Sequence, residues 1–229
     1  MKDLQENNVP ALNQNPSHVY IHETPNSRLR VLFVGNSITK HAPRPQIGWY
    51  RDCGMAASCL ENDYVHLVVK KLQAYDPNVS FAIAQVAQYE RTFFEKLACD
   101  DYQSAADFGA DVVIFFYGAN VSKDYDTMEN PPRTFEDAYE DMRNLVTRNG
   151  QARAFHAMGF YIRPQLEKEK LAVAHKYNDP YIDIDDIRMR EDTHGEFNHP
   201  SDLGMQLIAD RFGDAIVPAV QDILKSRTK

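Results

Sequence analysis

The fold is decided by one stretch of sequence, VLFVGNSIT at residues 31–39. Its first four residues form a short apolar run, which is typical of a strand buried on both faces of a parallel sheet. Gly35 permits a tight turn directly after that run. Ser37 is therefore expected at the carboxyl end of a strand, where open α/β sheets bind their ligands.

Strand and helix patterns alternate along the rest of the chain. Five segments indicate strands, namely 30–34, 79–84, 111–117, 152–158 and 181–184. Residues 18–22 alternate weakly and are a candidate for an added edge strand. Apolar residues at helical spacing indicate four helices, at 63–75, 134–147, 164–176 and 201–224. The alternation predicts an α/β fold, a three-layer α/β/α sandwich with a mostly parallel five-stranded sheet.

The 229 residues predict a single domain over residues 17–229. Residues 1–16 are rich in Asn and Gln and poor in apolar side chains, so we expect them to form a flexible arm. No apolar segment approaches the ~20 residues of a membrane span, and no signal peptide is visible at the N-terminus. We therefore expect a cytoplasmic protein, although a processed secreted form would look the same.

The charge and the cysteines exclude some classes of partner. A net charge of -8 argues against nucleic acid, because phosphates would be repelled. The three cysteines, Cys53, Cys59 and Cys99, lack metal-ligand spacing and are expected to be free thiols. The sequence does not indicate the oligomeric state.

A histidine far downstream supplies the partner that Ser37 needs to act as a nucleophile. His199 lies in the segment EFNHP, residues 196–200, just before the last predicted helix. An imidazole oriented by a carboxylate accepts the proton of a serine hydroxyl. Glu196, three residues earlier, is the expected carboxylate. His194 is the less favoured alternative for the base.

Asn120 follows the strand at 111–117 in the segment FYGAN, residues 116–120. An Asn amide after a glycine turn can donate to the negative charge that develops on a carbonyl oxygen when its carbon is attacked. Asn is otherwise ordinary in turns. The prediction depends on Ser37, His199 and Asn120 meeting at one edge of the sheet.

Residues 41–59 form a long connection between the first strand and the first long helix. The connection leaves the strand that carries Ser37, so it is expected over the same end of the sheet. It is either a long structural loop or one wall of a substrate pocket. In the second case His41 and Trp49 are the candidate substrate-binding residues, and Trp49 would stack on a sugar.

In this order the segments resemble the SGNH, or GDSL-like, hydrolase superfamily. Residues 35–37, GNS, look like the nucleophile block, and residues 118–120, GAN, look like the block that supplies an oxyanion donor. The segment at 196–200 looks like the last block, usually Asp-x-x-His. The resemblance spans about residues 30–225 and implies a flavodoxin-like SGNH hydrolase fold, with no metal and no organic cofactor.

Two positions depart from the family pattern. Glu90 stands about where the family has a glycine whose backbone N–H joins the oxyanion hole. Its N–H is still expected to donate there, together with Asn120 and the N–H of Ser37. Its carboxylate would contact Asn120 or the substrate, or lie in solvent at a helix start. Glu196 replaces the usual Asp and is expected to be less rigidly placed.

The resemblance implies a serine esterase or deacylase with Ser37, His199 and Glu196 as catalytic residues. The preferred substrate is a small acyl ester, by analogy an acetyl ester on a carbohydrate. One alternative is a catalytically impaired carbohydrate-binding module, in which Glu90 disrupts the oxyanion hole. The other is a lipase or thioesterase, which would need a broad apolar surface near Ser37.

Overall fold

A six-stranded sheet forms the middle layer of the computed structural model, which describes residues 18–227. The strands lie in the order β1-β3-β2-β4-β5-β6. Their bounds are β1 Val19–His22, β2 Arg30–Gly35, β3 Ser80–Gln85, β4 Val112–Phe116, β5 Arg153–Ala157 and β6 Tyr181–Ile182. All pairs are parallel except β1 with β3. The predicted α/β sandwich is confirmed, and the weak pattern at 18–22 provides a sixth strand beyond the five that were predicted.

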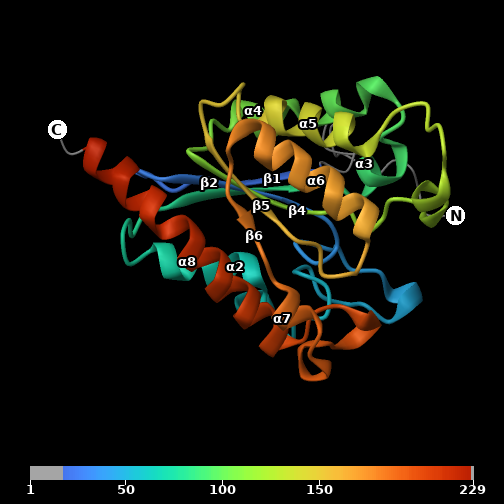
Figure 1. The fold of residues 1–229 in the computed structure, drawn as a ribbon. Helices are drawn as coiled ribbons and strands as arrows, with labels where there is room; N and C mark the ends of the chain where they lie inside the picture. Colours follow the sequence, from blue (N-terminus) through green and yellow to red (C-terminus); the bar gives the residue numbers. More distant parts are fainter. Residues whose placement is uncertain (1–17, 228–229) are drawn as a thin grey trace, which may run out of the picture.

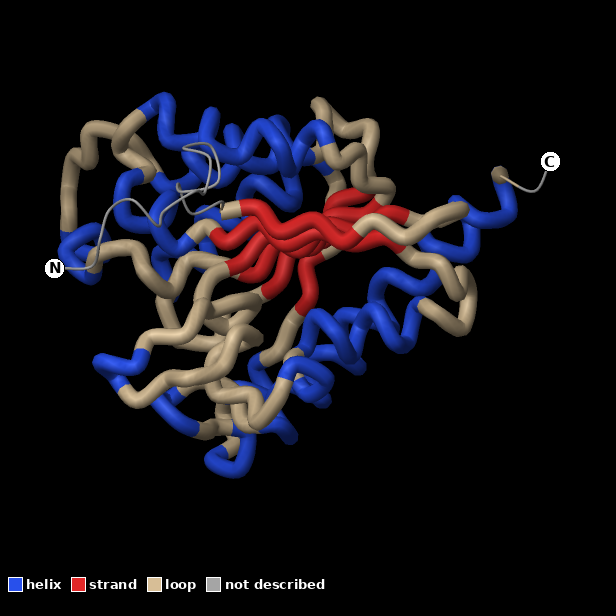
Figure 2. Tube along the Cα trace, turned by 180° about the vertical axis from the view of Figure 1, so that it is seen from behind, coloured by secondary structure: helices blue, strands red, loops and turns tan. Residues whose placement is uncertain are grey.

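Helices cover both faces of the sheet (Figures 1 and 2). On one face lie α2 (Tyr64–Leu72), α7 (Asp185–Arg188) and α8 (Asp202–Ser226). On the other lie α3 (Ala87–Thr92), α4 (Gln103–Asp107), α5 (Phe135–Val146) and α6 (Pro164–Tyr177). None of the helices in residues 18–227 is both long and apolar enough to cross a bilayer. The predicted arm at 1–16 lies outside the described residues.

The central strand β2 is buried on both faces, as its apolar run predicts. Val31 and Phe33 pack into the cluster beneath α2 and α8. Leu32 and Val34 point the other way, into the cluster beneath α4 and α5. This alternation follows from the two-residue period of a strand, and it fixes which residues after Val34 reach the edge of the sheet.

Side-chain caps start the long helices close to where the sequence predicts. The hydroxyl of Thr134 accepts a hydrogen bond from the N–H of Asp137 at the start of α5. The hydroxyl of Ser201 accepts one from the N–H of Gly204 at the start of α8. Each cap satisfies a backbone donor that the helix leaves unpaired. The second cap fixes the point at which the loop carrying His199 ends.

The loops that carry the candidate site leave the sheet side by side. Gly35, the last residue of β2, is in register with Phe116, the last residue of β4. A Cβ at Gly35 would lie 1.7 Å from the hydroxyl of Thr39, so only glycine fits the turn. Ser37 and Asn120 therefore project from neighbouring strand ends.

Candidate active site

The structure brings Ser37 and His199 together, although 162 positions separate them in the sequence. The Oγ of Ser37 lies 2.8 Å from the Nε2 of His199. A turn after β2 holds the serine, because the N–H groups of Thr39 and Lys40 both donate to the carbonyl of Asn36. The distance suits direct transfer of the hydroxyl proton to the imidazole.

The other ring nitrogen of His199 contacts a backbone carbonyl. Its Nδ1 lies 2.9 Å from the carbonyl oxygen of Phe197. A carbonyl only accepts, so Nδ1 carries the proton and Nε2 is left as the acceptor for Ser37. Burial lowers the pKa of His199, the bond to the Phe197 carbonyl opposes that shift, and the charge of His41 adds to it.

The carboxylate of Glu196 makes no hydrogen bond or ion pair with the imidazole of His199. Its carboxylate lies 3.3 Å from a guanidinium nitrogen of Arg51, and its side chain is 59% exposed. The turn explains the difference from the sequence prediction. Phe197 adopts a left-handed backbone with φ of 57°, and the N–H of His199 donates to the Glu196 carbonyl. The turn thereby presents the Phe197 carbonyl to the ring, and the Glu196 carboxylate is left on the surface.

Glu90 is fully buried and serves as an acceptor. Its backbone N–H donates to the carbonyl of Val86, the residue before α3, so it is not available for the oxyanion, contrary to the sequence prediction. Its carboxylate accepts from the side-chain amides of Asn36 and Asn120 and from the N–H of Gly118. Burial raises the pKa of Glu90, and the donors around it partly offset that shift.

Asn120 is held at both ends of its amide. Its Nδ2 donates to Glu90, and its Oδ1 accepts from a guanidinium nitrogen of Arg91 at 2.8 Å. The amide nitrogen carries two hydrogens, so one remains for a ligand. The N–H of Ser37 also has no acceptor among the described residues. Asn120 and Ser37 therefore each keep an N–H donor, and their role toward an oxyanion stays a prediction.

Trp49 is fully buried, so its face is not open to a sugar. Its Nε1 donates to the carbonyl of His41 at 3.1 Å, and its ring meets that of Phe197 edge to face at 6.5 Å. Trp49 thus packs the long connection against the histidine loop. His41 is half-buried, its Nδ1 lies 2.6 Å from the Ala42 carbonyl, and its imidazole contributes to the lowered pKa of His199.

An open pocket of about 370 Å³ is lined in part by Ser37 and His199. Its lining includes Ser37, Asn120, Lys123, Tyr161 and His199. The ring of Tyr161 stands nearly perpendicular to that of His199, with centroids 5.9 Å apart. The sequence interpretation missed Lys123 and Tyr161. Their positions in the sequence could have indicated them, because Lys123 lies in the connection after β4 and Tyr161 lies in the connection after β5.

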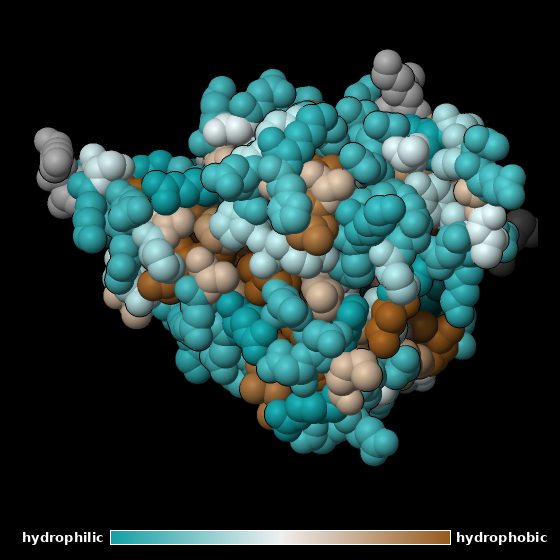
Figure 3. Space-filling model, in the orientation of Figure 1, coloured by the Kyte–Doolittle hydropathy of each residue, from teal (hydrophilic) through white to brown (hydrophobic). Residues whose placement is uncertain are grey.

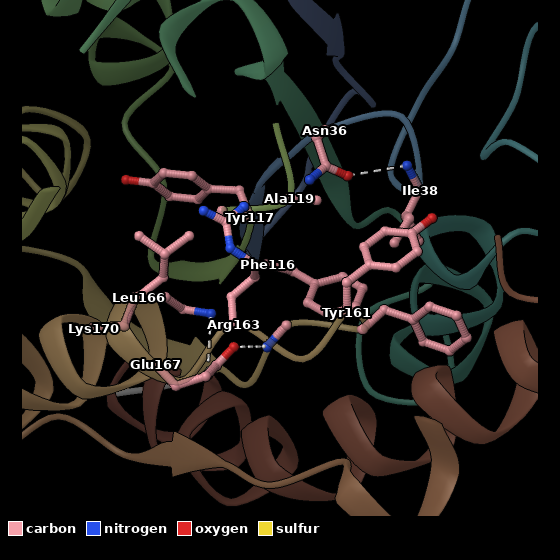
Figure 4. A pocket seen from close by; sticks show the side chains of 13 residues that line it. Asn36, Ile38, Phe116, Tyr117, Ala119, Tyr161, Arg163, Leu166, Glu167 and Lys170 are labelled. Atoms are coloured by element: carbon pink, nitrogen blue, oxygen red, sulfur yellow. Dashed lines mark hydrogen bonds and ion pairs between the residues drawn. The ribbon is translucent and has the colours of Figure 1, made fainter. Parts of the chain in front are cut away.

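A small cavity of about 10 Å³, partly open to the surface, lies beside the turn after β2 (Figure 4). The Oδ1 of Asn36 accepts from the N–H of Ile38 there, at 3.2 Å. The buried ammonium of Lys170 lies 3.5 Å from the Glu167 carboxylate at the far side. A space of this size holds about one water molecule. Within residues 18–227 no group of three or more His, Cys, Asp or Glu is placed to hold a metal.

Neither a family model nor a curated protein matches the sequence. Solved structures do match. A two-domain esterase (CEX) active on acetylated mannans, co-crystallized with mannopentaose, aligns with a TM-score of 0.58 at 18% identity, over 84% of this chain and 50% of that one. A family two carbohydrate esterase from Clostridium thermocellum, in complex with cellohexaose, aligns with a TM-score of 0.56 at 17% identity, over 87% and 66%.

A candidate GDSL-like lipase from Bacteroides uniformis aligns with a TM-score of 0.53 at 13% identity, over 83% of this chain and 96% of that one. The chain spans half the length of the mannan esterase. The fold common to these neighbours is the one that the sequence motifs predict. The chain therefore has the SGNH, or GDSL-like, hydrolase fold.

Proposed function

We propose that the protein is a serine esterase that hydrolyses a small acyl ester, by preference an acetyl ester on a carbohydrate. One observation carries the proposal, the 2.8 Å contact between the Ser37 hydroxyl and the Nε2 of His199. The carbonyl of Phe197 holds the tautomer in which that nitrogen accepts a proton. Donors at Asn120 and at the Ser37 N–H lie beside the pair.

The reaction proceeds in two transfers. The Oγ of Ser37 attacks the ester carbonyl while His199 takes its proton, and the oxyanion is held by Asn120 and the Ser37 N–H. The tetrahedral intermediate expels the alcohol, which takes the proton from His199, and an acyl-serine remains. Water then attacks the acyl-serine while His199 takes its proton, and the second tetrahedral intermediate expels the Oγ of Ser37, which takes that proton from His199 as the carboxylic acid is released.

The carbohydrate assignment is supported by the two esterase neighbours, whose structures hold mannopentaose and cellohexaose. The ring of Tyr161 lines the open pocket and can stack on a sugar, a role that buried Trp49 cannot fill. The face in Figure 3 is mostly hydrophilic, with apolar residues in small groups. Among the described residues, a broad apolar patch of the kind that binds lipid is not seen on that face.

The test combines a fluorophosphonate probe with ester substrates. Wild type should label, and Ser37→Ala should not. p-Nitrophenyl acetate should be cleaved faster than p-nitrophenyl decanoate, and acetylated manno- or cello-oligosaccharides should release acetate. Equal labelling of wild type and Ser37→Ala would contradict the enzyme proposal and favour a binding module. A preference for decanoate would favour a lipase or thioesterase.

A further inference from the structure

The Glu90 carboxylate joins the two loops that carry the candidate site. One of its donors is the amide of Asn36, at 3.0 Å, and Asn36 directly precedes Ser37. Its others come from Gly118 and Asn120 in the loop after β4. The two loops leave neighbouring strands, and Glu90 reaches both from α3.

This carboxylate is 0% exposed, which makes its position costly unless its oxygens are satisfied. One oxygen accepts from Asn36 and Gly118, and the other accepts from Asn120. All of these partners are neutral amides, and no cation lies among them. A buried group held so completely restricts the conformations of the loops that supply its donors.

The Asn120 amide belongs both to this hydrogen-bond network and to the proposed oxyanion hole. Glu90 takes one of its N–H groups, and Arg91 occupies its oxygen from the opposite end. A planar amide held at both ends cannot flip, so its second N–H has a fixed direction. Asn120 also lines the pocket that contains Ser37 and His199.

We propose that Glu90 is a positioning residue, which with Arg91 orients the Asn120 amide so that its second N–H meets the oxyanion. The inference rests on the proposed esterase function. Glu90 supplies no donor of its own, because its N–H donates to the Val86 carbonyl. It acts only through Asn120 and contributes most in the transition state, where charge develops on the carbonyl oxygen.

The first test is Glu90→Gln, which keeps the shape of the side chain but turns an NH2 group toward one of the amide donors. We expect kcat to fall by about tenfold or more, with KM within about twofold, because only the transition state uses the Asn120 donor. The affinity of a trifluoromethyl ketone, which forms an oxyanion on Ser37, should fall by the same factor. In an Asn120→Ala background, Glu90→Gln should have much less effect on kcat.

Two variants separate positioning from general stability. Glu169→Gln changes another buried carboxylate, which accepts from the Tyr125 hydroxyl and the Glu136 N–H, and it should lower Tm but leave kcat unchanged. Arg91→Gln removes the guanidinium that donates to the Asn120 oxygen. Because Arg91 is exposed, this variant tests the proposal even if Glu90→Gln fails to fold. It should lower kcat in the wild-type background but not in the Asn120→Ala background.

The outcomes distinguish this inference from the proposed function. Wild type that fails to label with the fluorophosphonate contradicts the esterase itself. The positioning role is contradicted if wild type labels but the fall in kcat of the double variant Glu90→Gln/Asn120→Ala equals the product of the falls in the two single variants. An unchanged kcat in folded Glu90→Gln, or in Arg91→Gln if Glu90→Gln fails to fold, contradicts it equally.

Discussion

The Nδ1 of His199 lies 2.9 Å from the carbonyl oxygen of Phe197, so a backbone carbonyl occupies the position that an acid side chain fills in a catalytic triad. A carbonyl fixes the tautomer and the orientation of the ring. It carries no full charge, and therefore stabilises the imidazolium less than a carboxylate would. The site is accordingly a Ser–His pair supported by the backbone, and Glu196 lies outside it.

Glu196→Gln should leave kcat almost unchanged. The substitution removes an exposed ion pair with Arg51, and such pairs contribute at most about 1 kcal/mol to stability. Steady-state kinetics and urea denaturation measure the two effects, with Arg51→Gln as the matched control. A large fall in kcat for Glu196→Gln alone would show that the carboxylate reaches His199 during turnover.

The acid limb of kcat/KM should titrate below the ordinary histidine pKa of 6.5, because burial lowers the pKa of His199. The base must be neutral, so activity rises as the pH passes upward through that lowered pKa. His41→Asn removes an imidazole that lowers the pKa of His199 and should move the limb to higher pH. A pH–rate profile of both proteins tests this, and a limb above 6.5 in wild type would oppose it.

Asn120→Ala should lower kcat by about 10²–10³, the usual cost of one oxyanion donor. KM should change little, because the ground-state ester carbonyl makes weak use of the amide. Kinetics with p-nitrophenyl acetate give both constants, and circular dichroism checks that the variant is folded. A change confined to KM would place Asn120 in substrate binding.

Trp49→Ala should destabilise the protein by about 3–5 kcal/mol, as expected for a fully buried aromatic side chain. Trp49→Phe retains most of the packing and should keep KM for acetylated oligosaccharides near that of wild type. Chemical denaturation and KM measurements check both expectations. A stable Trp49→Phe variant with a strongly raised KM would instead support stacking of Trp49 on the sugar.

The central strand and the contact between Ser37 and His199 were predictable from local sequence. The apolar run before Gly35 marks β2, and a histidine just before an amphipathic helix marks the start of α8. The meeting of Ser37 with His199 then follows from the topology of a parallel sheet. These predictions succeeded because each depends on short-range pattern and on one general rule of α/β folds.

The finer parts of the site depend on tertiary contacts that the sequence does not display. A glutamate in the first turn of a helix is usually solvated, yet Glu90 is buried because amide donors from two distant loops converge on it. Phe197 has a left-handed backbone, which is uncommon outside glycine and asparagine. The roles of Glu196 and Trp49 were misjudged for the same reason, because their partners come from loops without a regular pattern.

The most direct measurement is intact-mass and peptide mass spectrometry of the protein quenched during turnover of p-nitrophenyl acetate. We expect one added acetyl group, located on Ser37, in wild type, and none in Ser37→Ala or His199→Ala. Continued hydrolysis by Ser37→Ala, or an acetyl group on a different residue with Ser37 unmodified, would contradict a Ser37 nucleophile activated by His199.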